Sequence, residues 1–187
     1  MNLNIPYMET DNKLLNDAYR IAAGDIVGNI VYYQNGLLTE EKPCMIAGLD
    51  YNTPWTRDTA INIWNALSIL SPEVSKNTLL AVLEEEEGNI YIGGQYWDSI
   101  IWMIGAREYC RFHKDDNFYR LAFEAGRNSV HRLEEDEFDE EDGLFRGPAV
   151  YGDGIAAYPD KYSKWKGYFR LRRLWAVCHS GCMHFSR

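Results

Sequence analysis

Apolar residues recur every three or four positions along the first 133 residues, and this periodicity limits the possible folds more than any other feature. The first stretch runs through Leu14, Leu15, Ala18, Tyr19, Ala22, Ile26 and Ile30. Such spacing places apolar side chains on one face of an α-helix. The pattern predicts five helices, over residues 14–30, 56–70, 72–86, 97–113 and 116–133. We therefore expect an all-α fold, with short extended pieces at residues 90–92 and 144–146.

The links between these helices alternate in length. Ser71-Pro72 and Lys114-Asp115 are short, and Pro72 suits the first turn of the helix that it begins. The links at 32–55, 87–96 and 134–152 are long. A short link joins antiparallel neighbours, so the helices should form hairpins whose long loops all lie at one end. Binding and catalytic residues are commonly found on such loops.

Composition narrows the classes of function. The 187 residues suit a single domain with a substantial core. The net charge of −9 and the pI near 4.9 argue against a nucleic-acid partner, which needs a basic surface. No run of about 18 apolar residues exists, and the polar start lacks a signal peptide, so we expect no membrane partner and a cytoplasmic or periplasmic location. The spacing of the four cysteines predicts free thiols.

Three aspartates follow the three long loops. Asp58, Asp98 and Asp153 each stand at or near the expected start of a helix, where aspartate commonly accepts backbone N–H groups. Each also has an aromatic residue close by in sequence, and Arg57 and Arg146 add planar donors. Carboxylates, arginines and aromatic faces together are typical of a site that binds saccharides.

The motifs around these aspartates resemble the six-hairpin glycosidases of the (α/α)6 toroid. The resemblance is closest to the clan of glucosidases, trehalases and mannosylglycerate hydrolases, and to glycogen-debranching-like proteins. It covers residues 40–165 and rests on Trp-Thr-Arg-Asp at 55–58, Gln-Tyr-Trp-Asp-Ser-Ile-Ile-Trp at 95–102, and Asp-Gly-Leu-Phe-Arg-Gly-Pro-Ala-Val-Tyr-Gly-Asp-Gly at 142–154.

This resemblance implies an inverting glycoside hydrolase that acts on an oligosaccharide or disaccharide without a cofactor or a metal. Inverting hydrolysis uses two carboxyl groups about 6.5–9.5 Å apart, one protonating the leaving oxygen and one activating water. Asp153 matches the position of the general acid and would need a raised pKa. The expected substrate-binding residues are Trp55, Arg57, Asp58, Tyr96, Trp97, Asp98, Arg146 and Tyr151. In that clan the base is usually a glutamate from a later hairpin. This sequence shows no later hairpin, so we expect a truncated chain that binds sugar weakly and has little or no turnover.

The C-terminal segment departs from this pattern. No Asp or Glu follows Asp160, whereas residues 161–187 contain seven Lys or Arg. Cys178-His179-Ser180-Gly181-Cys182-Met183-His184 offers zinc-type ligands in unusual spacing, and the segment could also form an amphipathic helix. We favour a third interpretation, a sequence foreign to the family that replaces the rest of the ring after a frameshift or premature stop. The expectation is then a partial toroid that self-associates through its open flank.

Other interpretations remain open. Residues 134–142 contain eight acidic residues among nine and predict a solvated loop, with a calcium site as the alternative. A non-catalytic helical-hairpin module that binds carbohydrate or protein would explain the aromatic loops equally well. A polysaccharide lyase or sugar epimerase is less favoured, because such chemistry needs His or Tyr bases. His113 falls at the short-loop end of its predicted helix.

Overall fold

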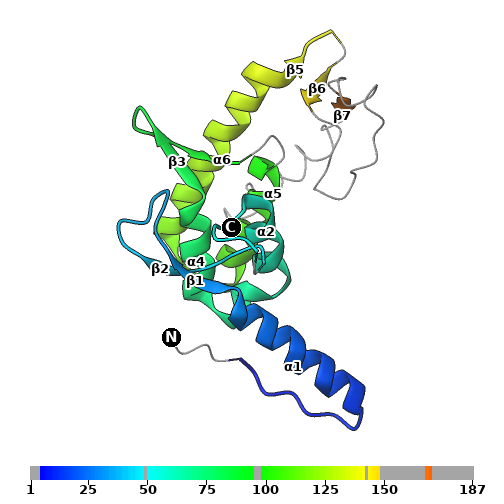
Figure 1. Cartoon of the computed structure of the whole chain (residues 1–187). Coiled ribbons are helices and arrows are strands. Elements are labelled where there is room, and N and C mark those ends of the chain that lie inside the picture. The colour runs from blue at the N-terminus through cyan, green and yellow to red at the C-terminus, as the bar shows by residue number, and fades with distance from the viewer. Residues whose placement is uncertain (1–4, 49, 95–97, 142, 148–166, 170–187) are drawn as a thin grey trace.

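The computed structural model describes residues 5–48, 50–94, 98–141, 143–147 and 167–169 (Figure 1). The described chain is mostly helical with a few short strands, as the periodicity predicts. Its elements are α1 Lys13–Gly28, β1 Ile30–Tyr33, β2 Lys42–Met45, α2 Thr56–Asn62, the π-helical turn η1 Ile63–Leu67, α3 Ser68–Leu70, α4 Pro72–Ala81, β3 Leu83–Glu86, β4 Asn89–Ile92, α5 Asp98–Phe112, α6 Asp116–Glu137, β5 Phe138–Asp139, β6 Leu144–Gly147 and β7 Gly167–Phe169.

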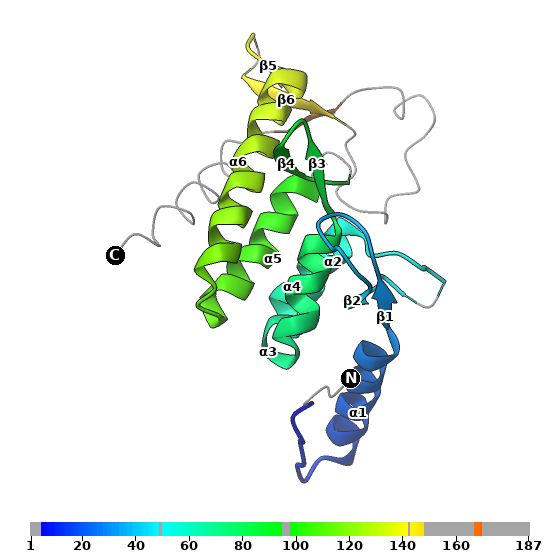
Figure 2. The same ribbon diagram turned by 90° about the vertical axis from the view of Figure 1, so that its left-hand side faces the viewer.

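Two helical hairpins form the body of the molecule. The continuous helix α2–η1–α3 turns back into α4, and α5 turns back into α6, as Figure 2 shows. The continuous helix α2–η1–α3 runs parallel to α5. Arg57 contacts Asp98 where both begin, and the His113 ring bonds to the Ser68 carbonyl near the end of both. The two short links therefore lie at one end of this pair and the heads of α2 and α5 at the other.

Local sequence accounts for the tight turns at the short-link end. The Ser71 hydroxyl accepts a hydrogen bond from the Val74 N–H, and Pro72 occupies the first turn of α4. The Asp115 carboxylate accepts one from the Phe118 N–H at 3.0 Å and caps α6. Both are favoured helix starts, since they satisfy N–H groups that lack a partner within the helix. The predictions of a break at 71–72 and of a short link at 114–115 are thus confirmed.

A close helix crossing and a buried indole hold the hairpins together. A Cβ atom on Gly105 of α5 would stand 2.8 Å from the Ala60 Cα of α2, so these two backbones approach closely because neither helix has a large side chain there. Trp102 is fully buried, and its indole N–H donates to the Leu79 carbonyl of α4 at 3.2 Å. Phe118 of α6 packs on the same indole. The core therefore draws on both hairpins.

The strands correct two predictions. The helix expected over 72–86 ends at Ala81, and the following glutamates form β3, which pairs with β4. Both turn residues, Glu87 and Gly88, have positive φ, as a two-residue β-hairpin turn requires. The loop expected over 32–55 contains a second hairpin, in which β1 pairs with β2 from Ile30↔Met45 to Tyr33↔Lys42. The expected extended pieces near 90–92 and 144–146 are confirmed as β4 and β6.

The acidic run also differs from the loop that its composition predicts. Its first four residues continue α6 to Glu137, and Phe138 and Asp139 form β5 against β6. Helix α1 ends at Gly28 rather than at Ile30, which begins β1.

Among the helices that the structure describes, none combines the length and the apolar character that crossing a bilayer requires.

Acid should weaken the short-link end of the molecule through Asp115. A hydrogen bond from the Lys76 ammonium at 2.6 Å and the bond from the Phe118 N–H hold the pKa of Asp115 below its ordinary value. A carboxyl group with a lowered folded-state pKa stabilises the fold above its unfolded pKa, near 4, and loses this contribution as the pH falls through the folded value.

We therefore expect the free energy of unfolding to fall as the solution is acidified below about pH 4, with Asp115→Asn lacking this part of the dependence. Urea denaturation at a series of pH values, for wild type and variant, measures it. A constant difference between the two proteins from neutral to acidic pH would contradict the role of Asp115. Exposed Asp116, replaced by Asn, serves as the matched control.

Candidate functional site

Two of the three predicted aspartates lie at adjacent helix heads. Asp58 lies in the first turn of α2, and Asp98 is the first residue of α5. Asp98 is only 2% exposed. One guanidinium nitrogen of Arg57 donates to both carboxylate oxygens of Asp98, at 2.7 and 2.9 Å. The expected convergence of the long linkers is therefore observed for the loops that precede α2 and α5.

The link from β4 to α5 is shaped to bring the two heads together. The Thr56 hydroxyl at the start of α2 donates to the Gly93 carbonyl at 2.8 Å. Gly94 has φ +113, and a Cβ there would stand 2.9 Å from the Thr56 Oγ1 and 2.8 Å from the Asp98 Cβ. Only glycine adopts this conformation readily. The Gly93-Gly94 pair thus lets α5 begin directly against α2.

An aromatic pair lies beside the ion pair. Trp55 immediately precedes α2 and is half-buried. The Arg57 guanidinium carbon lies 5.4 Å from the centre of its ring, within the range of a cation–π contact. Tyr51, which is 46% exposed, packs edge-on against Trp55 with ring centres 5.8 Å apart. This region combines an aromatic surface that water reaches with a charged pair that water scarcely reaches.

The ion pair restricts what each charged group can do. The Asp98 carboxylate is engaged by Arg57 and shielded from solvent, so it is suited to orienting the guanidinium rather than to transferring a proton to a ligand in solution. Arg57 carries further donors in a fixed planar arrangement. Asp58, one residue later, is partly exposed. Trp55, Arg57 and Asp58 are therefore partly accessible, whereas Asp98 is not.

The remaining predicted residues are not part of this geometry. Tyr96, Trp97, Tyr151 and Asp153 lie outside the described residues. Arg146 lies in β6, opposite Tyr168 of β7, and its side chain lies outside the described part of the chain. The distance between the expected acid and any second carboxylate therefore stays a prediction.

Sequence reasoning missed three contributors to the site. Tyr51 packs on Trp55, Gly94 lies against Asp98, and Thr56 bonds to the neighbouring Gly93 carbonyl, but none of the three was predicted as a site residue. The signal for Gly94 was present, since two successive glycines before a helix favour a turn that other residues cannot adopt. Thr56 carried a weaker signal as a hydroxyl at a helix start. For Tyr51 a sequence gives no way to separate a site residue from an ordinary loop aromatic.

Neither metal ligation nor thiol chemistry is supported by the described residues. Across the placed part of the chain, no three His, Cys, Asp or Glu side chains come together as a metal site, and this includes the described portion of the acidic run. Burial raises the pKa of Cys44 to about 12 and that of Cys110 to about 11. Both thiols thus stay protonated and poorly nucleophilic at neutral pH. Cys178, His179, Cys182 and His184 lie outside the described residues.

Comparison with protein-family models, with curated proteins and with solved structures gave no match to this chain.

Proposed function

We propose that this chain supplies hairpins of a six-hairpin (α/α)-toroid glycoside hydrolase and that the heads of α2 and α5 form part of its sugar-binding mouth. One observation carries the proposal: parallel helices of successive hairpins begin side by side, joined by the Arg57–Asp98 pair next to Trp55. Adjacent parallel helices linked through antiparallel ones are the repeating unit of such a ring. The resemblance at residues 55–58 and 95–102 falls at these same heads.

In this proposal the site residues divide the work of holding a sugar. The Trp55 ring stacks on the apolar face of a pyranose, and Tyr51 supports it from the edge. Asp98 fixes the plane of the Arg57 guanidinium, which lies 5.4 Å from the centre of the Trp55 ring and helps to hold that ring in place. Because the Asp98 charge neutralises Arg57, the arrangement suits an uncharged saccharide.

Catalysis in this proposal belongs to residues supplied by the later motif. Asp153 is the proposed general acid of an inverting reaction on an O-glycosyl bond, with a raised pKa that keeps its proton available. Asp58, Tyr96, Trp97, Arg146 and Tyr151 are the other proposed contacts to an oligosaccharide or disaccharide. We assign the general base to no residue of this chain.

Sugar binding tests the proposal directly. We expect saturable binding of maltose or trehalose, followed by saturation-transfer NMR, and at least tenfold weaker binding by Trp55→Ala because the stacking surface is lost. Trp64→Ala is the matched control, since Trp64 is an exposed tryptophan farther along the same continuous helix. Absence of saturable binding to any neutral disaccharide, or equal weakening by both variants, would refute the assignment.

A non-catalytic module that binds a protein is the second candidate. Ile61, Trp64 and Ile69 are exposed on the outer side of the α2–η1–α3 helix. Exposed tryptophan with aliphatic neighbours is common at protein interfaces. This candidate is supported if Trp64→Ala abolishes the binding of a protein partner while the wild-type chain binds no saccharide.

A further inference from the structure

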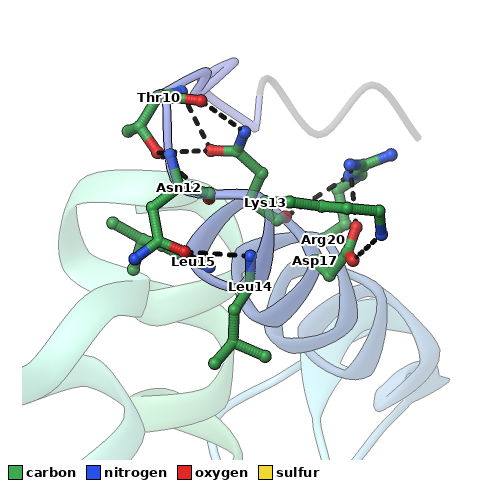
Figure 3. Close-up of polar contacts among 8 residues, drawn as sticks. Thr10, Asn12, Lys13, Leu14, Leu15, Asp17 and Arg20 are labelled. Carbon is green, nitrogen blue, oxygen red and sulfur yellow. Dashed lines mark hydrogen bonds and ion pairs between the residues drawn. The ribbon is translucent and has the colours of Figure 1, made fainter.

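Side chains that accept hydrogen bonds from backbone N–H groups have either a local or a distant partner in this chain. The Asn12 side chain is local, since it accepts from the first N–H groups of its own helix α1 at 3.0 and 3.3 Å (Figure 3). Two buried hydroxyls instead accept from a strand that is distant in sequence. Thr78 of α4 accepts from the Met45 N–H of β2 at 3.0 Å, and Ser129 of α6 accepts from the Ile92 N–H of β4 at 2.8 Å. Each of these two bonds fixes a strand against a helix.

Ser129 stands at the edge of β4 that β3 does not cover. In an antiparallel pair, the backbone groups of successive residues point alternately toward the partner strand and away from it. The Gly93 N–H donates to the Val82 carbonyl at 2.9 Å, so the N–H of Ile92 points away from β3. Ile92 is 7% and Ser129 3% exposed. The Ser129 hydroxyl therefore satisfies a strand N–H that water scarcely reaches.

Helix α6 holds β4 at two further points. The Asn128 side-chain amide donates to the Ile90 carbonyl at 3.1 Å, and the Arg132 guanidinium carbon lies 3.5 Å from the centre of the Tyr91 ring. Both of these α6 residues are partly exposed, whereas Ser129 is buried. Ser129 also makes the last of the three contacts along β4, next to the turn that leads to α5.

The two glycines after Ile92 carry this constraint to the heads of α2 and α5. The Gly93 carbonyl accepts from the Thr56 hydroxyl at 2.8 Å. A Cβ on Gly94 would stand 2.3 Å from the Asp98 Oδ2 atom, the same oxygen that Arg57 binds at 2.9 Å. Two residues span at most about 7 Å of extended chain. A displacement of Ile92 can therefore hardly be absorbed before it reaches the turn that touches Asp98.

We propose that Ser129 is a positioning residue of the candidate site. Its hydroxyl, acting through Ile92 and the two glycines, fixes the Gly94 turn and so the place at which the Asp98 carboxylate receives Arg57. Ser129 is too buried to touch a ligand itself. Its effect on sugar binding rests on the proposed function, whereas its effect on the Arg57–Asp98 pair does not.

Two NMR signals, the Gly94 backbone N–H and the Arg57 Nε–H, report this geometry without a ligand. Ser129→Ala should shift both signals and weaken the binding of maltose or trehalose about threefold or more, because the support of the site is loosened. Ser129→Thr keeps the oxygen and should restore both properties. Ser75→Ala is the matched control and should change neither, since Ser75 is a fully buried helix residue whose hydroxyl has no hydrogen-bond partner among the described residues.

A second control separates positioning from a general loss of stability. Thr78→Val removes the corresponding bond to β2 and should lower the midpoint of thermal unfolding as Ser129→Ala does, but it should leave the Arg57 signal in place. Equal shifts of that signal in both variants would overturn the proposal. Wild-type signals or wild-type affinity in Ser129→Ala would overturn it as well.

Two further outcomes are also decisive. If Ser129→Ala does not fold, Ser129→Cys replaces it in every comparison, because sulfur is a weaker acceptor than oxygen. If the wild-type chain binds neither disaccharide, the proposed function fails, and the Gly94 and Arg57 signals alone then support or overturn the role of Ser129.

Discussion

Replacing Asp98 by Asn should destabilise the fold by about 3–5 kcal/mol, the usual cost of leaving one member of a buried ion pair without its partner. Arg57 has a side chain only 14% exposed, and it would keep its charge against a neutral amide. The variant has nearly the same volume, so the loss reports charge rather than packing. Urea denaturation followed by circular dichroism measures it.

The matched control is Asp116→Asn, which also removes a carboxylate from the first turn of a helix but at an exposed position. Its expected cost is about 0.3–1 kcal/mol, from the helix dipole alone. Replacing both partners, as Arg57→Met with Asp98→Leu, should cost less than Asp98→Asn, because no charge is then left buried. Equal losses for Asp98→Asn and Asp116→Asn would mean that the pair contributes nothing beyond a helix start.

Removing the Trp102 side chain should destabilise the protein by about 3–5 kcal/mol, as expected for the largest side chains of a core. Trp102 is wholly buried and touches both hairpins, through the Leu79 carbonyl of α4 and the Phe118 ring of α6. Trp102→Phe keeps much of the packing but removes the N–H donor, for an expected cost of about 1–3 kcal/mol. Thermal and urea unfolding measure both losses.

Trp64→Ala is the control for this comparison, because Trp64 is 54% exposed and surface substitutions usually change stability by within about 0.5 kcal/mol. A loss for Trp64→Ala close to that for Trp102→Ala would contradict the placement of the core. It would indicate instead that the outer side of the α2–η1–α3 helix is covered in solution.

Helical periodicity predicted the two hairpins of the body because their burial repeats every turn. Ile63 and Leu67 face the core on one side of their helix, and Trp102 and Tyr109 do so on α5. The same rule failed at Leu83–Glu86, where four residues have too little pattern to separate a strand from a helix end. The positive φ values of Glu87 and Gly88 form the tight turn that pairs this segment with β4. A glutamate in the sequence does not predict a positive φ.

The candidate site was predictable in its charges but not in its pairing. Motif spacing indicated that Arg57 and Asp98 stand at helix starts, and both do. That they bind each other depends on a 41-residue separation closed by the parallel packing of α2 and α5, which no local pattern encodes. Burial of Asp98 follows from that packing, and so does its role in orienting Arg57.

The π-helical turn η1 interrupts the regular α-helical bonding between α2 and α3. A π-turn holds one residue more than regular α-helical bonding accommodates, and one residue corresponds to about 100° of rotation. The turn takes up this extra residue, so that Thr56–Asn62 still meets Asp98 at one end and Ser68–Leu70 still meets His113 at the other. Deleting a single residue between Ile63 and Leu67 should therefore restore regular α-helical bonding and keep both contacts. Inserting one further residue there should instead rotate one end by about 100° and break one of them.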